Sequence, residues 1–318
     1  DFTFPNVCKN VVVSDNNITA NGHGYIYSMS IVADEFELTN NNFDITAEAN
    51  YANAIAVGGP SSNGKVSGNV IEITAPNVVY GIYAYQLMGP IENVTYSDNI
   101  ITGNAYAACG FEIVMKNPVI SDNKITLNGN HTVAIVANSL DEGTISGNQI
   151  NSLGSNIGNQ STGDSMIHME SAGISVKGDW DISDNSINST SIGVNLILGG
   201  DIDLEDNVIN VIAKGETDNY AVYAKGMDEL TMSGNIVNFV GNVNENITSN
   251  GIYVFSSNGV HIFDNELNLN LVSAFVPWIE EPPGSWNYVR HAKSSGIVVV
   301  NSEDVIFASN NVKIGRAH

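Results

Sequence analysis

The sequence predicts an all-β fold, a right-handed single-stranded parallel β-helix of about eleven coils that spans residues 1–318 as one domain. Three observations predict it. A short phrase repeats along the whole chain, two apolar columns accompany each repeat, and no repeat contains a segment with the 3.6-residue period of a helix. The length alone suggests two domains, but a solenoid grows along one axis and escapes that expectation.

The repeated phrase has the form apolar–Ser–Asp/Gly–Asn–x–Ile and occurs eleven times, as in VSDNNI, YSDNII and MSGNIV. The distance from one phrase to the next is 22 to 45 residues, which is typical of the units of a solenoid. Each phrase contains one asparagine at a fixed place. These repeat asparagines are Asn16, Asn41, Asn69, Asn99, Asn123, Asn148, Asn185, Asn207, Asn235, Asn265 and Asn310.

Two columns beside the repeat asparagine are apolar in every copy. One lies three residues before it, from Val13 to Phe307, and the other two residues after it, from Ile18 to Val312. The positions between them are mostly polar, which indicates strands with one buried face. A second strand recurs as Gly/Ala–Ile–x–Val, for example at 81–85 and 251–255. Such short strands bury their apolar faces only by stacking, at about 4.8 Å per coil.

Asparagine is the most informative residue type in the composition, with 45 copies, whereas charged residues make up only 14% of the chain. Asparagine disfavours helices and favours turns and left-handed backbone. We therefore expect each repeat asparagine to occupy a bend in left-handed conformation. Its amide should hydrogen-bond to the repeat asparagines of the coils above and below.

The net charge of −23, with only two arginines, excludes several partners. Nucleic acid and anionic membrane surfaces both require clustered Lys and Arg, and the sequence has no such cluster. No stretch approaches the 18 apolar residues of a membrane-spanning helix. The chain begins with Asp1, so we expect a mature chain or an excised fragment. We also expect a monomer that requires no cofactor.

The two cysteines, Cys8 and Cys109, are about four predicted coils apart, or about 19 Å along the axis. A disulfide requires Cα atoms within about 7 Å. The sequence therefore predicts two free thiols that serve as small buried hydrophobic residues.

The repeats resemble those of the adhesin-like proteins of methanogenic archaea. The resemblance covers essentially the whole chain and depends on the S-D/G-N-x-I phrase, the G-I-Y strand, the asparagine content and the acidity. It implies a pectin-lyase-like solenoid outside the cell, a non-catalytic binding or spacer module that contacts other cells or surface glycans. The alternative is a polysaccharide lyase or a related carbohydrate-active enzyme, because the same type of helix carries such enzymes.

Two short features of the sequence bear on the enzyme alternative. The tripeptide 22–24 resembles one motif of polygalacturonases, but the other motifs of that family are missing, so we interpret His23 as a turn residue. Alternation places Asp179, Asp181, Asp201 and Asp203 together on the outer face of adjacent coils. Their like charges repel each other, and weakly bound Ca²⁺ would relieve that repulsion with oxygen ligands. Lys177 is the basic residue near this patch, as a calcium-dependent lyase would need.

Loop insertions are expected near 153–170 and 271–293, both between a repeat asparagine and the next Gly/Ala–Ile strand. The second insertion is unusually rich in residue types that are enriched in binding hot spots. Packing of its aromatic residues against the solenoid is the alternative interpretation. The candidate binding residues in this loop are Trp278, Trp286, Tyr288, Arg290 and His291.

Overall fold

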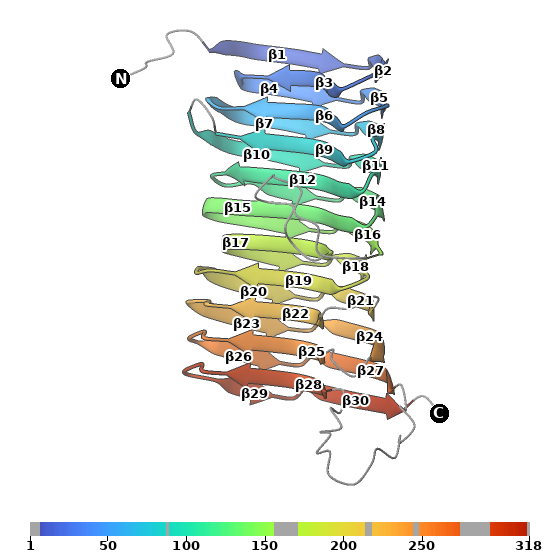
Figure 1. Ribbon diagram of the computed structural model, residues 1–318. Coiled ribbons are helices and arrows are strands. Elements are labelled where there is room, and N and C mark those ends of the chain that lie inside the picture. The colour runs from blue at the N-terminus through green and yellow to red at the C-terminus, as the bar shows by residue number, and fades with distance from the viewer. Residues whose placement is uncertain are drawn as a thin grey trace, which may run out of the picture.

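The computed structural model describes residues 7–86, 89–155, 171–213, 218–243, 248–273 and 293–316. This part of the chain is a stack of β-strand coils without any helix (Figure 1), and consequently contains no helix that could cross a membrane. All strand pairings are parallel. The predicted all-β parallel solenoid is thereby confirmed.

The strands form three ladders along the axis. The first ladder holds the strand that precedes each repeat asparagine. It consists of β1 (Cys8–Ser14), β4 (Ala33–Thr39), β7 (Ser61–Ser67), β10 (Ile91–Ser97), β13 (Val119–Ser121), β15 (His131–Ser146), β17 (Ala172–Ser183), β20 (Asp201–Glu205), β23 (Glu229–Ser233), β26 (Val260–Phe263) and β29 (Ile306–Ala308).

The strand after each repeat asparagine belongs to a separate eleven-stranded sheet. It consists of β2 (Asn17–Gly22), β5 (Asn42–Ala47), β8 (Val70–Thr74), β11 (Ile100–Asn104), β14 (Lys124–Gly129), β16 (Gln149–Gly154), β18 (Ser186–Ser189), β21 (Val208–Ala213), β24 (Ile236–Val243), β27 (Glu266–Ser273) and β30 (Asn311–Arg316).

The third ladder, called the bent ladder below, contains the Gly/Ala–Ile strands. Its strands β15 and β17 also run through the first ladder, which joins the two ladders into one 19-stranded sheet. Its other strands are β3 (Tyr25–Ile31), β6 (Tyr51–Gly58), β9 (Val78–Tyr85), β12 (Ala107–Met115), β19 (Ile192–Ile197), β22 (Asn219–Lys225), β25 (Thr248–Phe255) and β28 (Lys293–Val300).

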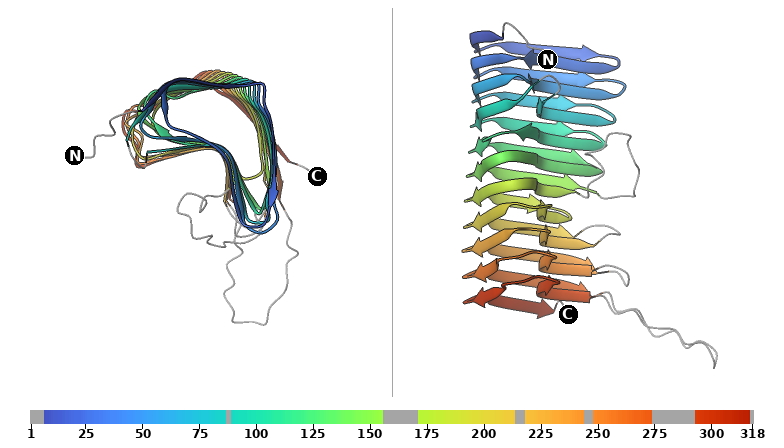
Figure 2. Two further views of the ribbon diagram at one scale, coloured as in Figure 1. Left: turned by 90° about the horizontal axis from the view of Figure 1, so that it is seen from above. Right: turned by 90° about the vertical axis from the view of Figure 1, so that its left-hand side faces the viewer.

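The two predicted apolar columns form the core of the solenoid. Their members are buried from Leu38 and Phe43 to Ile262 and Leu267. Phe307 belongs to the column three residues before the repeat asparagine. It lies at the C-terminal end of the described stack and is 50% exposed, because no described coil lies beyond it. Seen along the axis, the coils superpose closely and share one bent outline (Figure 2). The core is therefore a continuous apolar rod inside a stack of similar layers.

The repeat asparagines form a continuous internal ladder, as predicted. The Nδ2 of Asn99 donates to Oδ1 of Asn123 at 2.9 Å, and Nδ2 of Asn123 donates to Oδ1 of Asn148 at 3.0 Å. The same Oδ1 atoms also accept the backbone N–H of the preceding ladder member, as in Asn99 N to Asn123 Oδ1 at 3.0 Å. Buried polar groups require such partners, so the ladder satisfies both amides and turn backbone.

One predicted detail of this turn is wrong. The left-handed residue is not the repeat asparagine but the residue just before it, which has a positive φ in every repeat, for example 57° at Asp122 and 66° at Gly147. The physical reason is that the asparagine points inward to join the ladder, and the preceding residue makes the sharp bend. Asp, Asn and Gly tolerate that conformation, which explains the Asp/Gly position of the repeat phrase.

A second asparagine ladder lies on the outer face of the eleven-stranded sheet. Its side chains are partly exposed, and each Nδ2 donates to the preceding Oδ1 at 2.8–3.1 Å. Water can reach these groups, in contrast to those of the buried ladder. Its members are Asn151, Asn188, Asn210, Asn238 and Asn268.

Both cysteines are free thiols, as predicted, but only one has the predicted burial. Cys109 is buried, whereas Cys8 is exposed at the start of β1. The strand β1 is the first of its ladder and pairs on one side only, with β4. Its register partner on β4, Ala33, is fully buried in the core, so Cys8 is exposed because no described coil covers the other side of β1.

Candidate binding face

The bent ladder bends because two successive residues of each strand face the core. In β9, a Cβ added to Gly81 would meet the core residue Ile101 at 2.7 Å, and the next residue, Ile82, is fully buried in the same core. Strict alternation would place one of them outside. The preceding and following residues, Tyr80 and Tyr83, consequently lie on the outer face on either side of the bend.

This bend brings the outward-facing side chains on its two sides close together. The ring centroids of Tyr80 and Tyr83 are 5.4 Å apart, and Tyr80 is buried although it does not belong to the main core. It belongs to a separate apolar cluster together with Val78, Ala107 and Cys109. The outer face of the bent ladder therefore has its own small hydrophobic layer.

Six tyrosines on the first three strands of the bent ladder form one continuous ring cluster, the N-terminal tyrosine cluster. Neighbouring centroids are 5.3–5.9 Å apart, within the range of favourable aromatic contacts. The cluster runs from exposed rings (Tyr25, 70%; Tyr27, 64%) to the buried ring of Tyr80. Its members are Tyr25, Tyr27, Tyr51, Tyr80, Tyr83 and Tyr85.

Burial changes the pKa of two groups on this outer face, the Tyr51 phenol and the Cys109 thiol. Burial raises the pKa of the Tyr51 phenol above its ordinary value. Burial, and next the negative charge of Glu112, raise the pKa of the Cys109 thiol well above its ordinary value. Burial therefore favours the neutral forms of this phenol and this thiol.

A smaller aromatic group, the C-terminal tyrosine cluster, lies on β22 and β25 of the same ladder and consists of Tyr220, Tyr223 and Tyr253. The rings of Tyr223 and Tyr253 are stacked, with centroids 5.8 Å apart and an interplanar angle of 5°. Tyr220 contacts both rings at 5.1 and 5.5 Å. Lys225 lies beside them, with its Nζ 5.9 Å from the ring centroid of Phe255.

Sequence reasoning missed both tyrosine clusters, although a signal was present. The tyrosines of the G-I-Y segments, Tyr83 and Tyr253, directly follow the two inward residues of the bend. Tyr223 has the same place after Ala221 and Val222. Alignment of the chain on the Gly/Ala of this strand, rather than on the repeat asparagine, brings these tyrosines into one column.

The predicted aspartate patch is partly assembled. All four side chains are exposed, the backbone N–H of Asp201 donates to Oδ1 of Asp179 at 3.0 Å, and Asp181 pairs in register with Asp203. However, the described residues contain no group of three or more His, Cys, Asp or Glu side chains arranged to hold a metal ion. The calcium site therefore stays a prediction that the side-chain arrangement does not support.

The other predicted residues are scattered. Lys177 is exposed on β17, and its carbonyl accepts a hydrogen bond from the indole of Trp180 at 2.9 Å. At an exposed position, the Nε2 of His23 lies 2.6 Å from Oε2 of Glu48. The predicted loop residues, Trp278, Trp286, Tyr288, Arg290 and His291, lie outside the described residues, as does most of 153–170.

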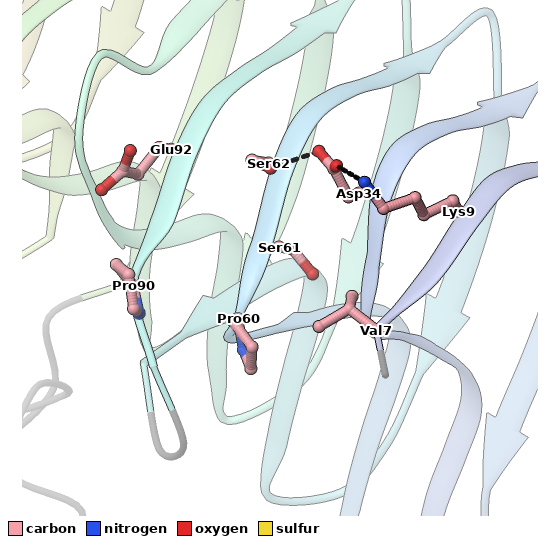
Figure 3. Close-up of a pocket in the computed structure, with 8 residues that line it drawn as sticks. All are labelled: Val7, Lys9, Asp34, Pro60, Ser61, Ser62, Pro90 and Glu92. Carbon is pink, nitrogen blue, oxygen red and sulfur yellow. Dashed lines mark hydrogen bonds and ion pairs between the residues drawn. The ribbon is translucent and has the colours of Figure 1, made fainter. Parts of the chain in front are cut away.

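An open pocket of about 370 Å³ lies beside the first ladder near its N-terminal end (Figure 3). Its charged groups are already paired: Lys9 contacts Asp34 at 3.2 Å, and Glu92 contacts Lys116 at 3.1 Å. The hydrogen bond from Ser62, with those from Lys9 and Asn63, holds the pKa of Asp34 below its ordinary value. The pocket is lined by Val7, Lys9, Asp34, Pro60, Ser61, Ser62, Pro90 and Glu92.

This pocket is a weaker candidate than the tyrosine face. Its acidic and basic side chains neutralise one another, so little uncompensated charge is left for a ligand. The tyrosine clusters instead present ring surface that no described part of the chain covers fully. Comparison of the chain with protein-family models, with curated proteins and with solved structures found no match. The resemblance to adhesin-like proteins therefore depends on the repeat phrase and composition alone.

Proposed function

We propose that this chain is a non-catalytic, adhesin-like module of the cell surface that binds glycans, or a protein of another cell, and acts as a spacer outside the cell. The observation that carries the proposal is the N-terminal tyrosine cluster. Its six rings are held on three adjacent strands of a rigid stack, and two of them are mostly exposed. Solenoids use such extended surfaces for binding.

Glycans fit this cluster better than other ligands do. The apolar C–H face of a sugar ring can pack against a phenol ring, while phenol hydroxyls are partners for sugar hydroxyls. Tyrosine also loses little conformational entropy when a ligand binds, because its side chain has two rotatable angles. The net charge of −23 opposes nucleic acid and other polyanions.

Two finer features belong to the same proposal. The coil is right-handed and pectin-lyase-like, because connections between parallel strands are almost always right-handed. The loop at 271–293 adds contacts through Trp278, Trp286, Tyr288, Arg290 and His291, whose residue types are enriched in hot spots.

Affinity gel electrophoresis tests the proposal. We expect gels containing glucomannan, galactomannan or neutral arabinoxylan to retard the wild-type chain in at least one case. Tyr27→Ala should weaken that retardation, whereas Ile212→Ala, which removes a similarly exposed side chain from the eleven-stranded sheet, should not. Failure of all three glycans to retard the wild-type chain would contradict glycan binding by this face.

A parallel assay addresses the enzyme alternative. The chain is incubated with polygalacturonate and Ca²⁺, and the ultraviolet absorbance of unsaturated product is followed. We expect no product. Product that disappears in Lys177→Ala would replace the non-catalytic proposal with a lyase.

A further inference from the structure

The two tyrosine clusters lie in one register column of the bent ladder. Strand pairing connects Tyr83 to Tyr223 through Glu112, Val136, Ser175 and Asn195, which is five strand-to-strand steps. At about 4.8 Å per step, the clusters are about 24 Å apart along the axis. A single straight line on one face of the solenoid therefore passes over both.

Between the clusters, this column contains no aromatic residue. Ser175 and Asn195 are buried, and the Asn195 Nδ2 donates to Ser175 Oγ at 3.1 Å. Glu112 is also buried, at 6% exposure, and Val136 is the remaining position. The column thus has bulky rings at two places and shorter, mostly polar side chains between them.

We propose that the two tyrosine clusters are two contact points for a single linear, uncharged polysaccharide that lies along the solenoid axis. The inference rests on the proposed glycan-binding function and specifies its ligand. A linear polymer is the ligand class that can reach both clusters at once. Linking two modest contacts in one molecule raises the overall affinity by much more than either contact provides alone.

The negative net charge of the chain favours an uncharged polymer over a polyanion. With 34 acidic and 11 basic residues, the surface repels polyanions such as polygalacturonate, and long-range repulsion also slows their association. Lys225, beside the C-terminal cluster, is already engaged with the Phe255 ring. The hydroxyls of exposed tyrosines on this face, such as Tyr25 and Tyr27, hydrogen-bond to sugar hydroxyl groups without requiring a charge.

The test measures how affinity depends on glycan length. Glucomannan and short glucomannan fragments, too short to span about 24 Å, are titrated by calorimetry into the wild-type chain, Tyr27→Ala and Tyr253→Ala. We expect the wild type to bind the polymer at least tenfold more tightly than the fragments, per mole of sugar. In either variant this ratio should fall to near one, while Ile212→Ala should retain it.

The possible results separate this inference from the function that it specifies. A wild-type chain that binds polymer and fragments equally, or a Tyr253→Ala variant that retains the full ratio, overturns the two-contact inference and leaves glycan binding intact. Tighter binding of polygalacturonate than of glucomannan overturns the choice of an uncharged ligand. If glucomannan does not bind, galactomannan and neutral arabinoxylan are titrated in the same way, and failure of all three refutes the proposed function and with it this inference. Circular dichroism of each variant checks that it is folded.

Discussion

Replacement of Asn185 by alanine removes one repeat asparagine from the middle of the internal ladder. This side chain is 1% exposed. Its Nδ2 donates to the Ile145 carbonyl and to Oδ1 of Asn207, both at 2.9 Å. Its Oδ1 accepts the backbone N–H and the Nδ2 of Asn148 at 3.0 and 2.9 Å. The substitution therefore breaks four hydrogen bonds between coils.

The expected loss follows from these bonds. An intramolecular hydrogen bond contributes about 1 kcal/mol net, so four of them correspond to about 4 kcal/mol in the free energy of unfolding. Partners left in the core without water add to the cost, because a buried unsatisfied donor or acceptor loses its solvation. The backbone N–H of Asn148 is one such group, since its acceptor is the Asn185 side chain.

Asn188→Ala is the matched control, because it removes an asparagine of the same coil from the outer ladder. Asn188 donates to Asn151 at 2.8 Å and accepts from Asn210 at 3.0 Å, but these groups are partly exposed. Water replaces the lost partners, so we expect a cost below about 1 kcal/mol. Urea unfolding of both variants, followed by circular dichroism, gives the two free energies at a common denaturant slope.

Equal costs for Asn185→Ala and Asn188→Ala would refute this reasoning, because burial would then not decide the value of an asparagine ladder. A loss below about 1 kcal/mol for Asn185→Ala would have the same meaning. A changed denaturant slope would instead indicate that the coils no longer unfold together, as stacked repeats can do.

Three further predictions concern single positions. Gly143→Ala should lower the free energy of unfolding by about 1–3 kcal/mol in urea titrations, because an added Cβ would lie 2.5 Å from the buried Trp180 ring; an unchanged value would contradict the close packing. Asp122→Val should cost about 1–2 kcal/mol by the same measurement, since φ is 57° there, whereas Asp122→Gly should be nearly neutral; equal costs would argue against backbone strain. A thiol reagent at mildly alkaline pH should modify Cys8 quickly and Cys109 only after unfolding, because burial raises the Cys109 pKa and blocks access; rapid modification of both in the native state, seen by mass spectrometry, would disagree.

Much of the solenoid could be predicted from the sequence because each of its rules is local and repeated. The columns from Leu38 to Ile262 and from Phe43 to Leu267 are buried where alternation places them. The ladder of repeat asparagines follows from a polar residue at a fixed place in every coil. Stacking of equivalent coils converts a repeat in the sequence into a column in space, so no long-range information is needed.

The sequence showed which residue types make the turn, but only the tertiary structure showed which of them has the left-handed conformation. Asparagine favours left-handed backbone, and that preference assigned the bend to the wrong residue. In the structure, the repeat asparagine points into the stack and Asp122 or its equivalent makes the bend. The demand of a buried amide for partners in adjacent coils outweighed the local preference of one residue type.

The tyrosine face depended on tertiary structure most of all. Period-2 alternation cannot predict a strand in which Gly81 and Ile82 both face the core, and that irregularity brings Tyr80 and Tyr83 together outside it. The sequence by itself determined the stack, its core and its asparagine ladder, because these repeat with the chain. Only the tertiary structure decided which outward side chains meet, because a bend in the strand and the register between coils set those distances.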